Sequence, residues 1–236
     1  AYRDFHCGNF MLAARNIVIE LLSAVTWGMA IGLLMAVTAN GFVYLVVIAT
    51  EYRTSFTLLE FQLQGQIYSL SSIFSLLAAA VLISVIRKFL DIKNWEGIAD
   101  SIYVAHRENP KIDTKKGLGS TFASLIVIGG GGSVGQYGPL VHFGSTIGLF
   151  IKNFFKLKMS PDIFIGCGVA AAIAAGFNAP LAGILFAHEA ILRHFSLRAI
   201  APISIASFSA SAFGEYFFGN SPALFELSQQ VPPLNE

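Results

Sequence analysis

Long stretches without charge alternate with short polar segments along this chain. Residues 21–50 contain no Asp, Glu, Lys or Arg, and their length exceeds the roughly 20 residues that a helix needs to cross a bilayer core. Residues 61–86 are again uncharged, which predicts a second helix that crosses back and ends at Arg87 and Lys88. Residues 1–20 mix charged and aromatic side chains, which is typical of an amphipathic segment at the membrane interface.

The later apolar segments are short or broken. Residues 95–105 have apolar positions at helical spacing but are too short to span, which predicts a half-helix inside the polar stretch 87–116. Residues 117–130 predict a helix that ends at four consecutive glycines. Residues 163–187 are uncharged but broken at 176–180, where glycine, asparagine and proline follow one another, so we expect two part-length helices there.

Further patterns complete the predicted fold. The run Ser160-Pro161-Asp162 is a helix start signal, and residues 199–214 predict a final apolar helix. Together the patterns predict an all-α membrane protein, a polytopic bundle of eight or nine tilted and broken helices over residues 1–220. Residues 221–236 are polar and contain proline, which predicts a linker or tail.

A glycine-rich run without charge is the main candidate for a binding site. Residues 129–148 lie inside the uncharged stretch 117–151, and irregular backbone at membrane depth is tolerated only where protein buries it or where it lines a cavity. Pro139 suits the first turn of a helix, so we expect a helix from about Tyr137–Pro139 to Phe150. The backbone amides before it would then form an anion site at a positive helix end.

Composition excludes several classes of protein. The chain is 55% hydrophobic and 12% charged, against about 25% charged residues in ordinary soluble domains. The net charge of +1 gives no case for nucleic acid binding. Cys7 and Cys167 are far apart, so no disulfide framework or metal site is expected. We find no catalytic triad pattern or phosphate loop, and therefore expect neither an enzyme nor a cofactor.

Two motifs stand out in the chain: Gly135, Gln136, Tyr137, Gly138 and Pro139, and the run FNAPLAG at residues 177–183. They resemble the CLC family of chloride channels and proton-coupled chloride transporters, in which the first stretch reads G-[KR]-E-G-P and the second starts a helix. The resemblance implies one half of a CLC-type inverted repeat, with the first five residues at the anion-binding site or gate. The family's second half, with a further binding loop and a coordinating tyrosine, is not found. We therefore expect a fragment, or a half completed by another polypeptide.

The chain departs from the family at both positions that handle protons. The family's gating glutamate is replaced by Tyr137, and a phenol with an ordinary pKa of about 10 cannot serve as a carboxylate gate, although it can donate a hydrogen bond to an anion. The family's inner pair of acids reads Glu189-Ala190, which keeps the first acid and loses the second. A shift of the alignment by one residue would instead make Glu189 the inner acid.

A third family motif, G-S-G-I-P, is matched in part by residues 96–99, EGIA. Gly97 and Ile98 are therefore further candidates for anion binding, and Glu96 stands where the family has a serine. A bare carboxylate opposes a bound anion, so Glu96 either points away, holds a proton, or reflects a different register. Together with Glu189 it is a candidate for the inner vestibule. For His142 and His188 we expect neutral rings bonded to neighbouring carbonyls, with pH sensing as the alternative.

The resemblance and its departures predict passive conduction of chloride or similar monovalent anions through the lipid bilayer. The alternatives are a proton-coupled exchanger that uses other acids, and a non-conducting relative with a structural or sensing role. The resemblance also implies a homodimer. We expect an integral membrane protein, in the inner (plasma) membrane of a bacterium, with the cation-rich stretch 87–116 on the cytoplasmic side.

Overall fold

The computed structural model describes residues 2–55, 60–63, 66–69, 71–107, 112–135 and 137–219. In this part of the chain, eight α-helices, one π-helix and a two-stranded hairpin follow one another. They are α1 (Tyr2–Ser55), β1 (Glu60–Leu63), β2 (Gln66–Ser69), α2 (Ser71–Phe89), α3 (Ile98–Ala105), α4 (Thr114–Gly129), α5 (Tyr137–Phe154), α6 (Pro161–Phe177), α7 (Pro180–Phe186), η1 (Ala187–Leu192) and α8 (Leu197–Phe218).

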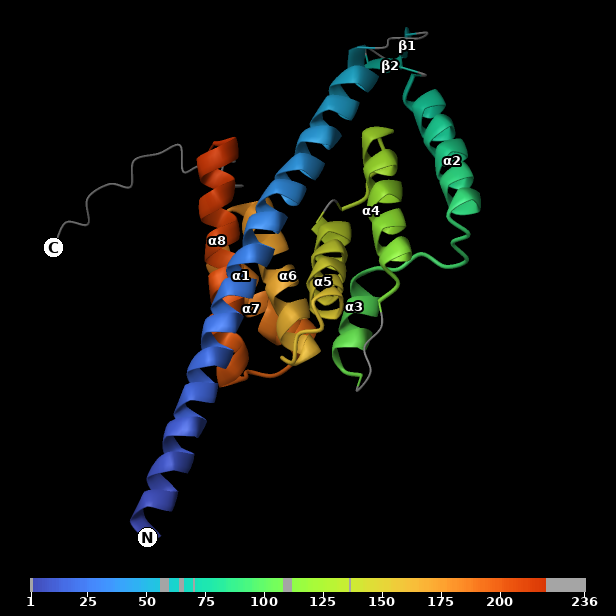
Figure 1. The fold of residues 1–236 in the computed structure, drawn as a ribbon. Helices are drawn as coiled ribbons and strands as arrows, with labels where there is room; N and C mark the ends of the chain where they lie inside the picture. The colour runs from blue at the N-terminus through green and yellow to red at the C-terminus, as the bar shows by residue number, and fades with distance from the viewer. Residues whose placement is uncertain are drawn as a thin grey trace, which may run out of the picture.

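The helices form one bundle that α1 crosses obliquely (Figure 1). Helix α8 packs along α1, and both contact α6, whose other side is covered by α5. Helices α3 and α4 continue the bundle beyond α5, and α2 packs mainly against α4. The core is richest on α6, where the run from Ile163 to Ala175 is buried without interruption.

Glycines allow α5 and α6 to approach closely. A Cβ placed on Gly144 of α5 would overlap the carbonyl group of Gly168 on α6, and a Cβ on Gly168 would overlap the carbonyl group of Gly144. Small residues at such crossings let helix backbones pack without intervening side chains. The contact fixes where α5 begins relative to the end of α6.

Most of the predicted helices are confirmed. Helix α5 starts at Tyr137, α6 starts at Pro161 after its N-cap residue Ser160, and α4 ends at Gly129 before a glycine turn. The predicted break after α6 is also present: Asn178 ends the helix in the left-handed conformation with φ of 50°, and Pro180 opens α7. The half-helix predicted over residues 95–105 begins at Ile98.

Two predictions near the N-terminus are wrong. Residues 61–86 do not form one crossing helix, because β1 and β2 pair as an antiparallel hairpin before α2 begins at Ser71. Apolar residues alternate with glutamine around Gly65, and this period of two favours strands over a helix. Residues 2–20 are not a separate interfacial segment, since they continue into the first span as part of α1. The expected tail, 221–236, lies outside the described residues.

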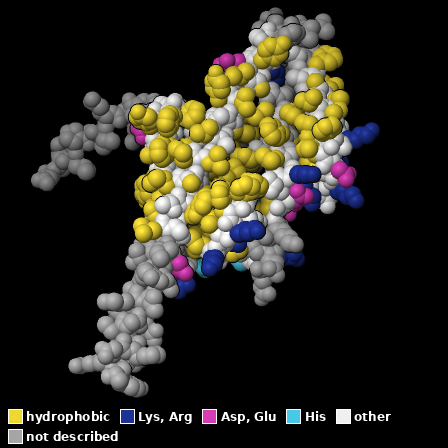
Figure 2. All heavy atoms as spheres, viewed as in Figure 1, with side chains coloured by type: hydrophobic (Ala, Val, Ile, Leu, Met, Phe, Trp, Pro, Cys, Tyr) yellow, Lys and Arg dark blue, Asp and Glu magenta, His cyan; other side chains and the backbone are white. Residues whose placement is uncertain are grey.

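The surface agrees with a membrane environment. Hydrophobic side chains cover most of the face shown in Figure 2, and Lys and Arg gather toward its lower and right-hand edges. Large apolar residues such as Tyr44, Val81 and Leu181 are about two-thirds exposed, at 66%, 65% and 66%. Among the described residues, 22–55 and α8 are long and apolar enough to cross a membrane by length and composition.

Candidate anion site at two helix ends

The N-terminal ends of α3 and α5 meet inside the bundle. The Cδ1 atom of Ile98, the first residue of α3, lies 3.6 Å from the position that a Cβ on Gly138 would take. Both helices therefore direct their positive ends to one region, as the sequence predicts from Gly97, Ile98 and the run that precedes Pro139. Converging helix ends create a site for an anion without a basic side chain.

The loop before α5 leaves its last glycine open. Gly131 has a φ of 96°, which favours glycine, and the amide of Gly132 donates to the carbonyl oxygen of Val127 at 2.8 Å. Gly135 is exposed, and a Cβ built on it would meet no atom within 4 Å. Gln136, the next candidate, lies outside the described residues.

Tyr137 is held by the end of α6. Its ring stacks on Phe177 with a centroid distance of 3.7 Å and an interplanar angle of 29°. A Cβ on Gly176 would come within 2.8 Å of Cε1 of the tyrosine ring, so this glycine makes room for the stack. Phe177 is the first residue of the FNAPLAG motif, so this motif positions the ring of Tyr137.

The N-terminal end of α3 differs from that of α5, because a carboxylate of the protein already lies there. The Gly97 amide donates to Oδ2 of Asp100 at 2.8 Å, and no acidic residue lies in the first turn of α5. An aspartate in this position neutralises part of the positive helix end. Asp100 was not among the residues singled out from the sequence, although an acid three residues after a helix cap is a recognisable signal.

Glu96 points toward α4 and α5. Its Oε1 lies 3.4 Å from Nζ of Lys116, and its Oε2 lies 3.8 Å from Nε2 of His142. The backbone amide of Glu96 donates to the Ser120 hydroxyl at 3.1 Å. Burial raises the pKa of the Glu96 carboxyl, while the Lys116 ammonium opposes that shift. Of the three explanations for this unexpected acid, the geometry favours a side chain turned toward partners.

The other inner candidate lies in a different setting. Glu189 is exposed on η1, and no ion pair to it is present in the described part of the chain. The nearby His194 faces Asp162 on α6, with 3.6 Å between Nε2 and Oδ2. Glu96 and Glu189 are therefore not brought into one cluster.

The expected hydrogen bonds to neighbouring carbonyls are not found for His188 among the described residues, whereas the backbone of Gly97 interacts with the His142 ring. Nδ1 of His142 lies 2.8 Å from the Ser101 hydroxyl, and its Nε2 has no hydrogen-bond partner in the described structure. His188 packs against Phe195 with a centroid distance of 4.9 Å. Sequence reasoning missed Ser101, Ser145 and Lys116, because hydroxyls and a lysine at a helix start carry no distinctive local pattern.

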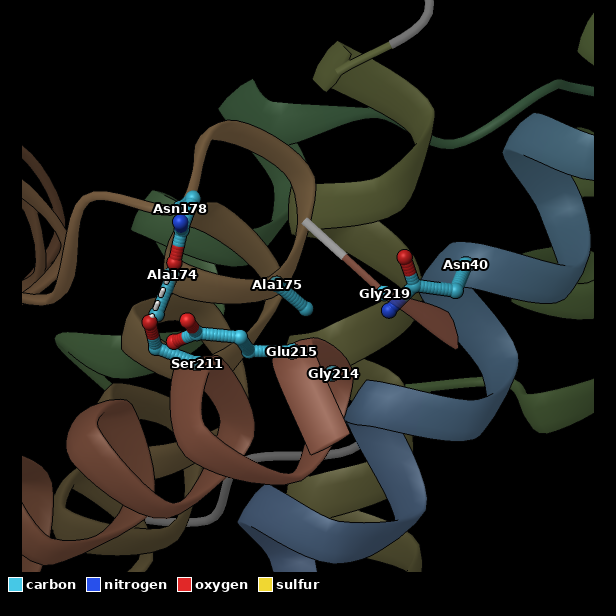
Figure 3. Close-up of a pocket in the computed structure, with 8 residues that line it drawn as sticks. All are labelled: Asn40, Ala174, Ala175, Asn178, Ser211, Gly214, Glu215 and Gly219. Carbon is cyan, nitrogen blue, oxygen red and sulfur yellow. Dashed lines mark hydrogen bonds between the residues drawn. The ribbon is translucent and has the colours of Figure 1, made fainter. Parts of the chain in front are cut away.

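Two cavities are separate from the place where the N-terminal ends of α3 and α5 meet. One, of about 10 Å³, is close to the size of a single water molecule and lies where α6, α8 and α1 meet (Figure 3). There the Ser211 hydroxyl donates to Oδ1 of Asn178 at 2.6 Å, which ties α8 to the break after α6. The other, of about 230 Å³, lies between α1, α4 and α5, and its lining is almost wholly apolar. Neither cavity offers the convergent donors that an anion needs.

Known proteins share this arrangement. A family model for the voltage gated chloride channel matches residues 76–236. The voltage-gated ClC-type chloride channel ClcB of Yersinia pseudotuberculosis serotype O:1b (strain IP 31758) and that of Yersinia pestis are each 28% identical over 124 residues, which cover 52% of this chain and 30% of theirs.

Solved structures show the same fold. A CLC-type fluoride/proton antiporter has a TM-score of 0.72 at 22% identity, covering 92% of this chain and 51% of its own. A slow cyanobacterial Cl-/H+ antiporter has a TM-score of 0.70 at 22% identity, covering 89% and 50%. The chain thus spans less than a third of the curated relatives and about half of the solved ones. The predicted fold, a bundle of broken helices, is confirmed.

Proposed function

This chain belongs to the voltage gated chloride channel family, and we propose that it contributes to a passive pathway for chloride or a similar monovalent anion across a membrane. Family membership makes it an integral membrane protein. The observation that carries the proposal is the open N-terminal end of α5, beside an aromatic side chain instead of a carboxylate. Backbone amides at that end replace part of the hydration shell of an anion, while binding stays weak enough for release.

Tyr137 supports conduction without proton exchange. A carboxylate gate competes with anions when charged and leaves when protonated, but a phenol stays neutral across the physiological pH range. The stack on Phe177 also restricts the ring to one place. The second proton-handling position of the family corresponds to Ala190, which cannot carry a proton.

Proton-coupled exchange is the second candidate, and Glu96 favours it. This carboxylate is only 18% exposed and lies between Lys116 and His142 near the start of α3. The two solved structures are of proteins named antiporters, whereas the Yersinia relatives are named channels. Flux of chloride and flux of protons therefore have to be measured together.

The completed assembly is part of the same proposal. The family resemblance supports an inverted second half that covers the ends of α3 and α5, in the same or another polypeptide, and a homodimer of such units. Cations lie at the ends of α2 and α5 and at the starts of α4 and α8, which supports placing these ends on the cytoplasmic side; they are Arg87, Lys88, Lys115, Lys116, Lys152 and Arg198. We propose the inner membrane of a bacterium as the location.

The test is a flux measurement in liposomes. The full protein is reconstituted, a chloride gradient is imposed, and chloride efflux and external pH are recorded together. We expect chloride efflux without net proton movement. Proton uptake in a fixed ratio to chloride efflux would show exchange and not passive conduction. Absence of flux for every anion tested would favour a structural or sensing role.

A further inference from the structure

The polar cluster of Glu96, Ser101, His142 and Ser145 joins the loop before α3 to the buried face of α5. Ser101, His142 and Ser145 are each 0% exposed, so their polar atoms depend on one another for hydrogen bonds. The two serine hydroxyls lie 2.6 Å apart, and the Ser101 hydroxyl lies 2.8 Å from Nδ1 of His142. Only Glu96 reaches the surface of the cluster.

Two directions of these hydrogen bonds fit the geometry. If the Ser145 hydroxyl donates to Ser101, then Ser101 donates to Nδ1 of His142, and the His142 carbonyl still accepts from Thr146 at 2.8 Å, which leaves the ring hydrogen on Nε2. If the Ser145 hydroxyl instead donates to the His142 carbonyl at 2.7 Å, it accepts from Ser101, whose oxygen accepts from the imidazole. In this second arrangement His142 carries a hydrogen on Nδ1.

The other ring nitrogen then faces an acceptor. With Nδ1 protonated, neutral His142 presents a lone pair at Nε2, which lies 3.8 Å from Oε2 of Glu96 and has no hydrogen-bond partner in the described structure. A lone pair beside a carboxylate, both withdrawn from water, is an unfavourable arrangement. One added proton, on either atom, turns this repulsion into a charge-assisted or neutral hydrogen bond.

We propose that His142 holds its hydrogen on Nδ1, that Glu96 and His142 form a binding site for a single proton, and that its occupancy adjusts anion permeation from the side of the membrane that carries the 87–116 segment. The effect on permeation rests on the proposed function, whereas proton binding does not. Burial raises the pKa of the Glu96 carboxyl, which favours proton uptake, while the Lys116 ammonium opposes it. No bond other than those to the proton changes.

The charged groups around the pair make the added proton effective. From α4, Lys116 balances the Glu96 charge at 3.4 Å, and from α3, Asp100 is occupied by the Gly97 amide. Asp100 and the N-cap residue Asp113 of α4 both raise the pKa of the Glu96 carboxyl. The other charged residues of the packed elements are Lys115 on α4, Lys152 on α5, Asp162 on α6, Glu189 on η1, and Glu20, Glu51 and Arg53 on α1. One added proton makes the net charge of the groups beside the start of α3 more positive by one.

Protonation is also linked to backbone position. Closing the gap from 3.8 Å to a hydrogen bond of about 2.8 Å moves the Glu96 side chain toward α5. Gly97, the cap of α3, is the next residue in the chain. The added positive charge and this shift both favour an anion near the start of α3, so flux increases as the pH falls.

The direct test is ¹⁵N nuclear magnetic resonance of the full protein with labelled histidine, assigned by loss of the signal in His142→Gln. At about pH 8 we expect a hydrogen on Nδ1 and none on Nε2, with one proton gained by the pair toward about pH 5. A hydrogen on Nε2 at high pH, or no proton uptake across this range, would overturn the proposal.

The functional test measures anion flux in liposomes across the same pH range. Wild-type flux rises about threefold to tenfold as pH falls, as expected for one charge added near an anion path. Glu96→Gln, which places a neutral donor opposite Nε2, gives a flux that no longer depends on pH. The control Glu20→Gln removes an exposed acid on α1 and retains the wild-type response.

The two tests fail in different ways. A pH-independent wild-type flux, with proton uptake seen by resonance, would overturn the role in permeation and leave the proton site standing. Absence of flux at every pH would contradict the proposed function, and the resonance measurement alone would then decide whether the pair binds a proton.

Discussion

The two helix ends that meet in this bundle are unlike in charge. At α5 the first turn has no acid, and its first residue, Tyr137, stacks on Phe177. At α3 the first turn contains Asp100, whose carboxylate takes the Gly97 amide, and Glu96 stands directly before the cap. An anion from solution therefore meets an open positive end at α5 and an occupied one at α3.

This difference shows that a helix end alone does not define an anion site. Helix α3 has a dipole like that of α5, but the Asp100 side chain of α3 itself places a negative charge at the N-terminal end. We infer that α5 provides most of the attraction for a permeating anion. Four substitutions separate the contributions of the two ends.

The largest effect is expected from Gly168→Ala. The added methyl group would overlap the carbonyl group of Gly144 and push α5 away from α6, and overpacking of this kind costs about 1–3 kcal/mol or more. Folded protein recovered after size-exclusion chromatography, and its melting temperature, should both fall sharply. The control is Gly41→Ala on α1, where an added Cβ meets no atom within 4 Å. Equal behaviour of the two variants would mean that the α5–α6 contact is looser than described.

The second-largest effect, on chloride efflux, is expected from Tyr137→Glu. A carboxylate at the open end of α5 competes with the anion, so chloride efflux at about pH 7.5 should fall roughly tenfold and recover at about pH 4.5, where the carboxyl gains a proton. Both variants at Tyr137 are combined with Glu96→Gln, so that the pH response expected of Glu96 and His142 is absent. In that background Tyr137→Gln, which has the same shape without the charge, should show no such recovery, and a pH-independent flux in Tyr137→Glu would show that this residue lies off the anion path.

A smaller effect is expected from Asp100→Asn. Removing the charge uncovers the positive end of α3, so chloride affinity measured by calorimetry should rise about twofold to fivefold, in line with a helix-dipole contribution of about 0.3–1 kcal/mol. The matched control is Asp91→Asn, since Asp91 is exposed and has a φ of 50° that asparagine also adopts. An unchanged affinity would remove the contrast between the two ends.

The smallest effect is expected from Tyr137→Phe. The ring stack on Phe177 is retained, and no hydrogen bond of the phenol is present in the described structure. Flux should change by less than about twofold, because a lost neutral hydrogen bond that water can replace contributes little. A drop of tenfold or more in stopped-flow efflux would instead identify the phenol as a direct ligand of the anion.

Much of this fold is predictable because its determinants are local. Pro161 and Pro180 fix helix starts, Asn178 ends a helix, and the glycines after α4 end another, so each boundary is readable from a few adjacent residues. The hairpin was missed because residues 61–86 were judged by the absence of charge. The alternation of apolar residues and glutamine in residues 61–67 contained the better signal.

The candidate site was predictable only in part. The run before Pro139 and the motif at Phe177 were found, yet their stacking depends on the crossing of α5 and α6 and has no sequence signature. For Glu96 the sequence left three explanations open, since the partners Lys116 and His142 come from two other helices. Local sequence patterns do not show which residues from distant segments come into contact.

The most direct test of the contrast between the two ends is the position of bromide, found by anomalous X-ray scattering in crystals of the full protein. We predict a bromide peak at the start of α5, within hydrogen-bond distance of the Gly138 amide, with the Gly97 amide still bonded to Asp100. A peak on the Gly97 amide with Asp100 displaced, and none at α5, would contradict the account.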